Sequence, residues 1–325
     1  MKVDPTHIPR VTRDDGVVTA HLSDAGGLTQ FGACHETLPP GATSSRRHWH
    51  TSEDEFLYVL DGTATVVDDA GRHDLAPGDA ALWRHGDPNA HHVTNRGTAP
   101  CTYLIVGSRV LEDVCHYPDH AQQQVNTATT WSVRDENGTE LRGGDLPPGL
   151  QNLPPVWGTP YDPATPATPA PRILRNPAHW IAEPDPTHPI LGSGCGPYSS
   201  LLLSDLGKLS QFGAFIEALP PGSASSHRHW HEREDEMVHI LSGTVTLVED
   251  SETPLTAGDT ACWAAGTPMG HRLENRSAAP ARYLVIGTRH QRDVIHYSDH
   301  DLITHKDGAS RRYLHRDGTP WQRDT

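Results

Sequence analysis

A histidine-rich segment that occurs twice constrains the fold of this chain more than any other sequence feature. Residues 48–55 read His-Trp-His-Thr-Ser-Glu-Asp-Glu, and 229–236, lying 181 residues later, read His-Trp-His-Glu-Arg-Glu-Asp-Glu. The similarity continues elsewhere, as in Leu-Thr-Gln-Phe-Gly-Ala at 28–33 and Leu-Ser-Gln-Phe-Gly-Ala at 209–214. Self-similarity over this length indicates a duplicated domain.

The repeat extends over most of both halves. After a one-residue deletion between residues 69 and 79, the spacing between the copies becomes 180 and then stays constant. The other matched segments are 4–7 with 185–188, 38–41 with 219–222, 103–107 with 283–287, and 114–117 with 294–297. We therefore predict an N-terminal domain over 1–139, a connector over 140–181 and a C-terminal domain over 182–325, with the same fold in both domains.

The predicted connector is rich in proline, with ten prolines from Pro147 to Pro177. Proline lacks an amide proton and has a fixed φ, so such a stretch is unsuited to a helix or a central strand. We interpret it as an extended, passive spacer. The alternative is a strap packed over one barrel through Trp157, Tyr161 and Trp180.

The local pattern indicates β-strands in both halves. The runs 55–60, 63–67 and 103–106 are short, rich in β-branched or aromatic residues, and bounded by Gly, Pro, Asp or Asn. Tight-turn sequences occur at 76–79 and 256–259. Long amphipathic helical patterns are absent from the sequence. Many short strands at close spacing predict an all-β chain with a sandwich or barrel in each half.

The alternation of side chains along strands indicates how the repeated polar residues can meet. His48 and His50 are two residues apart, so both project to the same face of an extended segment. Glu55 follows a polar stretch, 51–54, that suits a turn, and so can begin the next strand facing inward. With His91 from a later strand, we predict four ligands at one point inside the barrel.

Three imidazoles and one carboxylate are a suitable donor set for a divalent transition metal. Fe(II) is the ion that we expect first, while Mn(II), Ni(II), Cu(II) and Zn(II) suit the same donors. Four protein ligands leave two positions of an octahedral ion for water, substrate or dioxygen, as in catalytic rather than structural sites. Because the set occurs twice, we predict one ion per barrel.

The spacing of these residues resembles that of the cupin superfamily. The pattern Gly-x6-His-x-His-x4-Glu-x6-Gly over 41–62, repeated over 222–243, is similar to the first cupin motif. The segments 78–95 and 258–275, each a Gly-Asp pair followed later by His-x3-Asn, are similar to the second. The resemblance implies two tandem double-stranded β-helix (jelly-roll) barrels, a bicupin with ligand sets like those of quercetinases and oxalate decarboxylases. The implied metal ligands are His48, His50, Glu55 and His91, and His229, His231, Glu236 and His271.

One departure from the family pattern concerns the last histidine. Four residues separate Gly86 from His91, whereas two are usual, so His92 is an alternative ligand. Arg272 occupies the place of His92 in the second copy, which favours His91 and its equivalent, His271.

A second ambiguity concerns residue 227, because His227, His229 and His231 alternate and any two could form the ligand pair. Alignment with the first copy favours the later two. By alternation, His227 and its equivalent Arg46 share the inward face, where a cation could hold a substrate carboxylate. The alternative is a rim charge paired with a nearby acidic side chain. Our candidate catalytic residues are Glu55, Glu236, Arg46 and His227.

Composition limits the partners and the compartment. The net charge is −15 and no Lys/Arg-rich run occurs, which argues against nucleic acid and anionic membranes as partners. The five cysteines are scattered without a Cys-x-x-Cys pair, so we expect reduced thiols in a cytoplasmic chain. No apolar run approaches a membrane span, and the first residues do not resemble a secretory signal. We expect a small-molecule substrate and pairing of the two barrels within the chain. The sequence leaves open whether the chain also forms a homo-oligomer.

The segments 113–120 and 293–300 add further histidine and aspartate, and are similar to the tails of uncharacterised bacterial single-barrel cupins. A second metal site is one interpretation. The other, which we favour, is packing or hydrogen bonding against the neighbouring half.

Three function classes fit the sequence. The first is a metal-dependent dioxygenase or other oxidoreductase acting on an enol, diketone, aromatic or carboxylate substrate, which the intact glutamates favour by resemblance to quercetinases. The second is a redox-neutral decarboxylase, lyase or isomerase, in which the metal polarises a carbonyl or carboxylate. The third is a non-enzymatic ligand-binding or storage bicupin. Cys34 and His35, which replace apolar residues of the second copy, favour polar chemistry in the first barrel.

Overall fold

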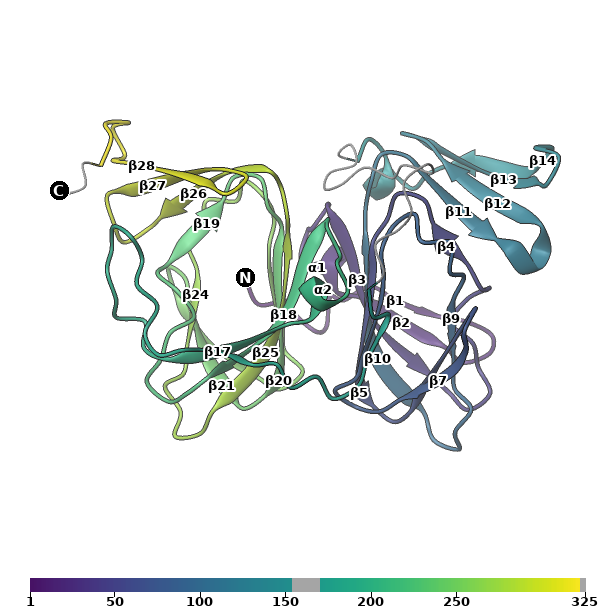
Figure 1. Cartoon of the computed structure of the whole chain (residues 1–325), viewed down its shortest axis with the longest axis horizontal. Coiled ribbons are helices and arrows are strands. Elements are labelled where there is room, and N and C mark those ends of the chain that lie inside the picture. The colour runs from purple at the N-terminus through teal and green to yellow at the C-terminus, as the bar shows by residue number, and fades with distance from the viewer. Residues whose placement is uncertain (154–169, 322–325) are drawn as a thin grey trace.

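Two β-barrels lie side by side in the computed structural model of the chain, which describes residues 1–153 and 170–321 (Figure 1). The two α-helices, α1 (Leu22–Ala25) and α2 (Leu203–Leu206), are only four residues long each. The predicted all-β fold with two tandem jelly-roll barrels is confirmed. Among the described residues, no helix has the length and apolar character that a membrane span requires.

The N-terminal barrel consists of antiparallel strands. They are β1 (Arg10–Thr12), β2 (Val18–His21), β3 (Phe31–Leu38), β4 (Trp49–His50), β5 (Glu55–Asp61), β6 (Ala64–Asp68), β7 (Gly71–Leu75), β8 (Ala80–Trp83), β9 (His92–Thr94), β10 (Cys101–Ser108), β11 (Asp113–Tyr117), β12 (Gln122–Asn126), β13 (Thr130–Asp135), β14 (Glu140–Asp145) and β15 (Ile173–Leu174), with short 3-10 turns η1 (Pro118–His120) and η2 (Pro148–Leu150). The three sheets have the strand orders β1-β2-β3-β10-β5-β8-β15, β7-β6-β9 and β14-β13-β12-β11-β4.

The C-terminal barrel repeats this arrangement. Its strands are β16 (Ile181–Glu183), β17 (Tyr198–Leu202), β18 (Phe212–Leu219), β19 (His229–His231), β20 (Glu236–Ser242), β21 (Thr244–Val248), β22 (Glu252–Thr256), β23 (Thr260–Trp263), β24 (Arg272–Glu274), β25 (Ala281–Thr288), β26 (Arg292–Tyr297), β27 (Leu302–Asp307) and β28 (Ser310–Leu314). They form sheets of order β16-β17-β18-β25-β20-β23, β22-β21-β24 and β19-β26-β27-β28.

The leading segment of each half pairs with the other barrel. Lys2 forms a bridge to Ala261 of β23, while Ile173 of β15 pairs with Ala81 of the equivalent strand β8. Lys2 therefore corresponds to Ile173, an offset of 173 − 2 = 171 rather than 181. The predicted match of 4–7 with 185–188 is wrong for this reason, since the first lies before β1 and the second after β16.

The connector is partly structured. Residues 140–145, which we expected in the connector, contain no proline and form β14, paired with β13. At the other end, β15 pairs with β8, and Trp180 packs against a hydrophobic cluster, so this part is not a passive spacer. Trp157 and Tyr161, the other proposed anchors, lie outside the described residues.

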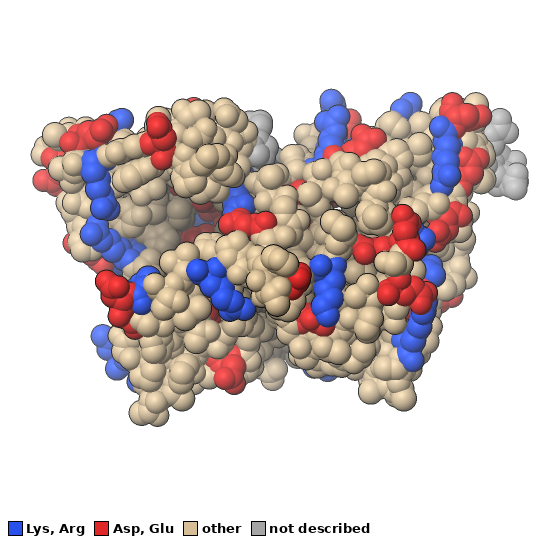
Figure 2. All heavy atoms as spheres, turned by 180° about the vertical axis from the view of Figure 1, so that it is seen from behind, with Lys and Arg blue, Asp and Glu red and all other residues tan. Residues whose placement is uncertain are grey.

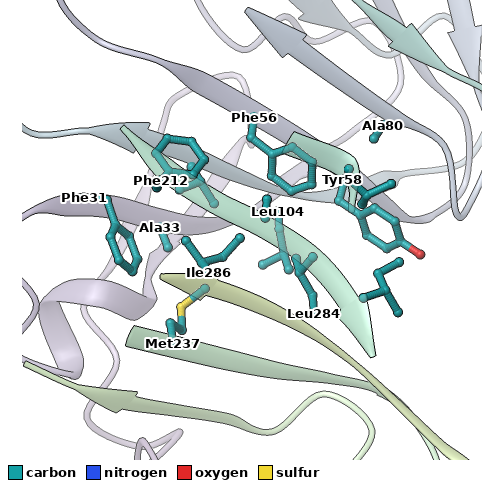
Figure 3. Close-up of a cluster of buried hydrophobic side chains, with 14 of the residues drawn as sticks. Phe31, Ala33, Phe56, Tyr58, Ala80, Leu104, Phe212, Met237, Leu284 and Ile286 are labelled. Carbon is teal, nitrogen blue, oxygen red and sulfur yellow. The ribbon is translucent and has the colours of Figure 1, made fainter. Parts of the chain in front are cut away.

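A hydrophobic core shared by both barrels holds them together (Figure 3). The N-terminal barrel contributes Phe31, Ala33, Phe56, Tyr58, Ala80 and Leu104, and the C-terminal barrel contributes Phe212, Met237, Leu284 and Ile286. The central strand β5 is apolar from Phe56 to Leu60 because its two faces serve different cores. Phe56 and Tyr58 face the shared core, whereas Leu57 and Val59 face the barrel's own core.

Two buried aspartates add a polar connection across this interface. Asp54 Oδ2 accepts hydrogen bonds from the backbone amides of Ser210 and Gln211, at 2.6 and 2.9 Å. Its pseudosymmetric equivalent Asp235 accepts from the amides of Thr29 and Gln30, at 2.7 and 2.8 Å. Both aspartates are fully buried. Each one directly precedes the predicted glutamate ligand of its barrel, so the interface fixes the start of a strand that carries a ligand.

Candidate metal centres

The N-terminal barrel brings its four predicted ligands together. His48 forms a bridge to His91, β4 carries His50, and Glu55 begins β5. Glu55 Oε2 lies 2.9 Å from His91 Nε2 and 4.0 Å from His50 Nε2, and Oε1 lies 3.8 Å from His48 Nε2. The alternative ligand His92 lies on β9 with its Nδ1 3.2 Å from the carbonyl oxygen of Ser45, so it is turned away from this group.

Each of these imidazoles is oriented by a hydrogen bond at Nδ1. His48 Nδ1 donates to the Arg46 carbonyl at 2.8 Å, and His91 Nδ1 donates to the Asn89 carbonyl at 3.1 Å. His50 Nδ1 lies 2.6 Å from Asp113 Oδ2. A carbonyl oxygen can only accept, so Nδ1 of His48 and of His91 carries the proton and their Nε2 lone pairs are free to bind a metal. The Asp113 carboxylate likewise holds a proton on His50 Nδ1, which leaves Nε2 as the ligating atom of that ring. The donors therefore fit a divalent transition metal.

The charge of Glu55 suits the same role. Burial alone would favour the neutral acid, but the neighbouring imidazoles of His50, His91 and His48 outweigh it and hold the pKa of Glu55 well below its usual value. The indole ring of Trp83 stacks on His91 with 3.8 Å between the ring centroids, which restricts rotation of that ligand. An ionised carboxylate among oriented imidazoles is a typical metal-binding arrangement.

The C-terminal barrel has an equivalent group. His229, His231 and Glu236 have ligand atoms within 4.8 Å of one another, and His271 Nε2 lies 3.0 Å from Glu236 Oε2. The Nδ1 atoms of His229 and His271 donate to the carbonyls of residues 227 and 269, as in the first barrel. Burial opposes ionisation of Glu236, but the imidazoles, His271 foremost, lower its pKa to about 2.

The aspartates that orient one histidine in each barrel were not predicted from the sequence. Asp113 on β11 contacts His50, and Asp293 on β26 contacts His231, both at 2.6 Å. We expected segments 113–120 and 293–300 to pack or hydrogen-bond against the neighbouring half. This is wrong for strands β11 and β26, since β11 pairs with β4 and β26 pairs with β19, each within its own barrel. The repeated Asp-Val-x-His-Tyr pattern was the available signal, but only the strand register shows which side chain faces the ligands.

Asp113→Asn is expected to weaken metal binding in the N-terminal barrel about 10- to 100-fold, because the amide is a poorer acceptor for His50 Nδ1–H. Titration of the metal-stripped chain with Mn²⁺ measures the affinities of the two sites. Asp293→Asn is the matched control and should weaken the other site. Equal weakening of both sites by either variant would contradict this role.

A cavity of about 330 Å³ opens above His48 and His50. Figure 2 shows a hollow on the N-terminal barrel, on the left of the view, with Lys or Arg side chains at its rim. Arg46, one of the candidate catalytic residues, lines the cavity together with Arg142. The remaining lining residues are Ser45, Cys115, Tyr117, Gln124, Asn126 and Val133. The polar character of this cavity thus comes from β12, β14 and the loop before β4 rather than from Cys34 and His35.

The C-terminal barrel encloses a smaller cavity, of about 190 Å³, beside its ligands. Glu217 lines it and accepts a 2.5 Å hydrogen bond from the Tyr283 hydroxyl. Burial raises the pKa of Glu217 to about 7, although the tyrosine hydrogen bond opposes this rise. Phe215 and Val238 contribute apolar walls, and Arg272, which also lines the cavity, is paired with Glu274, so this cavity suits a smaller guest than the first one.

His227 does not join the C-terminal ligands. It lines a separate cavity with Cys195 and Arg272, and its ring lies 5.3 Å from that of His300. Residues 225–228 form a bend, as residues 44–47 around Arg46 do, so alternation along a strand does not determine where either side chain points. The residue equivalent to Arg46 therefore has no corresponding place at the second centre.

Comparisons with known proteins agree with the fold. The family model described as Cupin domain matches residues 34–107 and 215–287. A structure from Silicibacter pomeroyi, described as a sugar phosphate isomerase from a cupin superfamily, is 38% identical and covers 44% of this chain and 97% of its own, with a TM-score of 0.42. Oxalate decarboxylase from Bacillus subtilis is 19% identical over 90% of this chain and 78% of its own, with a TM-score of 0.51. The enzyme from Lactobacillus farciminis is 16% identical over 89% and 86%, with a TM-score of 0.52. The search of curated proteins finds no match.

Proposed function

Because the chain belongs to the cupin superfamily and carries two cupin domains, we propose that it is a metal-dependent enzyme that converts a small oxygenated anion without net oxidation, in its N-terminal barrel. The observation that supports this proposal is the pair Arg46 and Arg142 at the cavity above His48 and His50. The fold similarity to oxalate decarboxylases does not transfer their reaction, so the proposal depends on these side chains.

Both arginines are available to a ligand. The described residues include no carboxylate within ion-pair distance of Arg46 or Arg142, whereas Arg47, next in sequence, pairs with Asp69 and Asp119. Arg46 donates to Gln122 Oε1 at 3.2 Å, and Arg142 lies over the ring of Trp131. Two guanidinium groups without acidic partners beside one cavity favour a carboxylate or phosphate guest.

The roles of the residues follow from their positions. A divalent metal held by His48, His50, Glu55 and His91 would polarise a carbonyl or carboxylate oxygen of the substrate. Arg46 and Arg142 would bind and orient the anionic group, and Gln124 and Asn126 would hydrogen-bond to hydroxyl or carbonyl oxygens. Asp113 would keep His50 in the ligating tautomer.

Dioxygenase chemistry remains the second candidate. It is favoured by the complete ligand sets, which retain Glu55 and Glu236, because a metal held by them would supply a site at which dioxygen could be activated. The fold comparisons do not distinguish it from redox-neutral chemistry. A panel of small carboxylates and sugar phosphates, including oxalate and glucose 6-phosphate, tested in air and anaerobically, separates the two. Turnover without dioxygen supports the proposal, and dioxygen uptake in step with turnover overturns it.

Arg46→Met and Arg142→Met are each expected to raise KM for the anionic substrate about tenfold or more with a smaller change in kcat, because each removes one charge-assisted contact. Arg276→Met is the control, since Arg276 pairs with Glu252 and Glu274 on the surface of the other barrel. Steady-state kinetics on the panel give both constants. An unchanged KM in both cavity variants would contradict anion binding in the cavity above His48 and His50.

A further inference from the structure

Strand β11 turns three alternate side chains toward the N-terminal ligands. Cys115 pairs directly with His50 across the β4–β11 ladder, so their side chains share a face. Two residues away on either side, Asp113 reaches His50 and the Tyr117 ring lies 6.1 Å from that of His48. Cys115 therefore occupies the central position of a strand face that serves the metal centre.

The thiol lies within ligating range of the same centre. Single ligand atoms of His48, His50 and Cys115 all lie within 4.8 Å of one another. His48 also belongs to the group with Glu55 and His91, so the two groups share one histidine. Cys115 lines the cavity although its residue is only 4% exposed. A buried soft donor next to imidazole ligands can contribute to a transition-metal site.

The second barrel lacks this donor. Ile295 pairs with His231 across the β19–β26 ladder, the position that Cys115 takes opposite His50. The other elements of the two centres correspond, including the orienting aspartates. The chain therefore contains two similar centres that differ at this position, one with the thiol of Cys115 and one with the alkyl side chain of Ile295.

We propose that Cys115 is an additional metal ligand of the N-terminal centre, which makes the two centres different in metal preference. Binding replaces the S–H proton by a sulfur–metal bond, and the proton is released to solvent. Thiolate donors favour Zn²⁺ and copper over Mn²⁺, so the N-terminal site should prefer softer ions than the C-terminal site does. The inference rests on metal binding at the ligand sets, which the proposed function also requires.

Cobalt absorption tests the inference on the full chain. Metal-stripped protein loaded with two equivalents of Co²⁺ should show a near-ultraviolet thiolate-to-cobalt charge-transfer band. Cys115→Ile, which copies the Ile295 pairing of the other barrel, should abolish the band while two equivalents still bind. Ile295→Cys in the Cys115→Ile background should restore a band, now from the C-terminal centre.

The outcomes separate the inference from the proposed function. Two bound equivalents without the band, or a band that persists in Cys115→Ile, overturns thiolate ligation and leaves metal binding intact. Failure to bind cobalt at all overturns both. Cys115→Ser provides a second variant if isoleucine perturbs folding, and it should also lose the band, with an unchanged near-ultraviolet circular dichroism spectrum of the aromatic residues.

Discussion

Asp54→Ala is expected to lower the free energy of unfolding by about 3 kcal/mol or more. The carboxylate is fully buried and accepts hydrogen bonds from the amides of Ser210 and Gln211 in the other barrel and from the amide of His85 in its own. Alanine leaves three buried donors without an acceptor, and each costs about 1 to 3 kcal/mol. Urea denaturation followed by fluorescence measures the loss.

A pH dependence should accompany this contribution. Burial disfavours the charged form of Asp54, but hydrogen bonds from His85 and from the backbone outweigh it and lower its pKa below the ordinary value. A lowered carboxyl pKa gives stability that is complete above the ordinary value and is lost as the pH falls through the folded-state value. The stability difference between wild type and Asp54→Ala should therefore be largest at neutral pH and shrink in acid.

Surface and isosteric variants provide controls for Asp54→Ala. Glu252→Ala breaks an exposed pair with Arg276 and should cost less than about 1 kcal/mol. Asp54→Asn retains one acceptor oxygen and should fall between the two, which keeps the test valid if the alanine variant does not fold. A loss in Asp54→Ala no larger than in Glu252→Ala would contradict the role of this interface carboxylate.

His50→Ala is expected to reduce turnover at least about 1000-fold, whereas His231→Ala should retain most of it. The reason is that the N-terminal centre lies beside the arginine-lined cavity, and loss of a metal ligand removes several kcal/mol of transition-state stabilisation there. The two variants are matched controls, because each removes the histidine that an aspartate orients. Activity lost only in His231→Ala would move the reaction to the C-terminal barrel.

The sequence predicts those features that depend on the internal repeat and on the two-residue alternation of side chains along strands. The duplicated β-fold is confirmed, and the predicted ligands of each barrel lie together because His-x-His on one strand and Glu55 at the start of the next converge locally. Alternation along a strand does not apply where the backbone is not extended, as at Arg46 and His227, which both lie in bends, and only Arg46 lines the cavity above its ligands.

Long-range pairing could not be predicted from the sequence alone. The contacts of Asp54 with Ser210 and of Cys115 with His50 depend on which strands become neighbours, and no local pattern carries that information. The first segments of the two halves could not be aligned from the sequence either. The short Asp-Pro-Thr-His match gave an incorrect alignment, which only the strand pairing corrects. The site residues that lie outside the two cupin motifs likewise depend on long-range strand pairing.

Metal stoichiometry tests the central claim, that each barrel assembles one metal centre from its own side chains. Metal-stripped protein is loaded with Mn²⁺, freed of excess, and measured by elemental analysis beside His50→Ala, His231→Ala and the double variant. We expect two equivalents in the wild type, one in each single variant and none in the double variant. Two equivalents retained in either single variant, or one equivalent or fewer in the wild type, would contradict this claim.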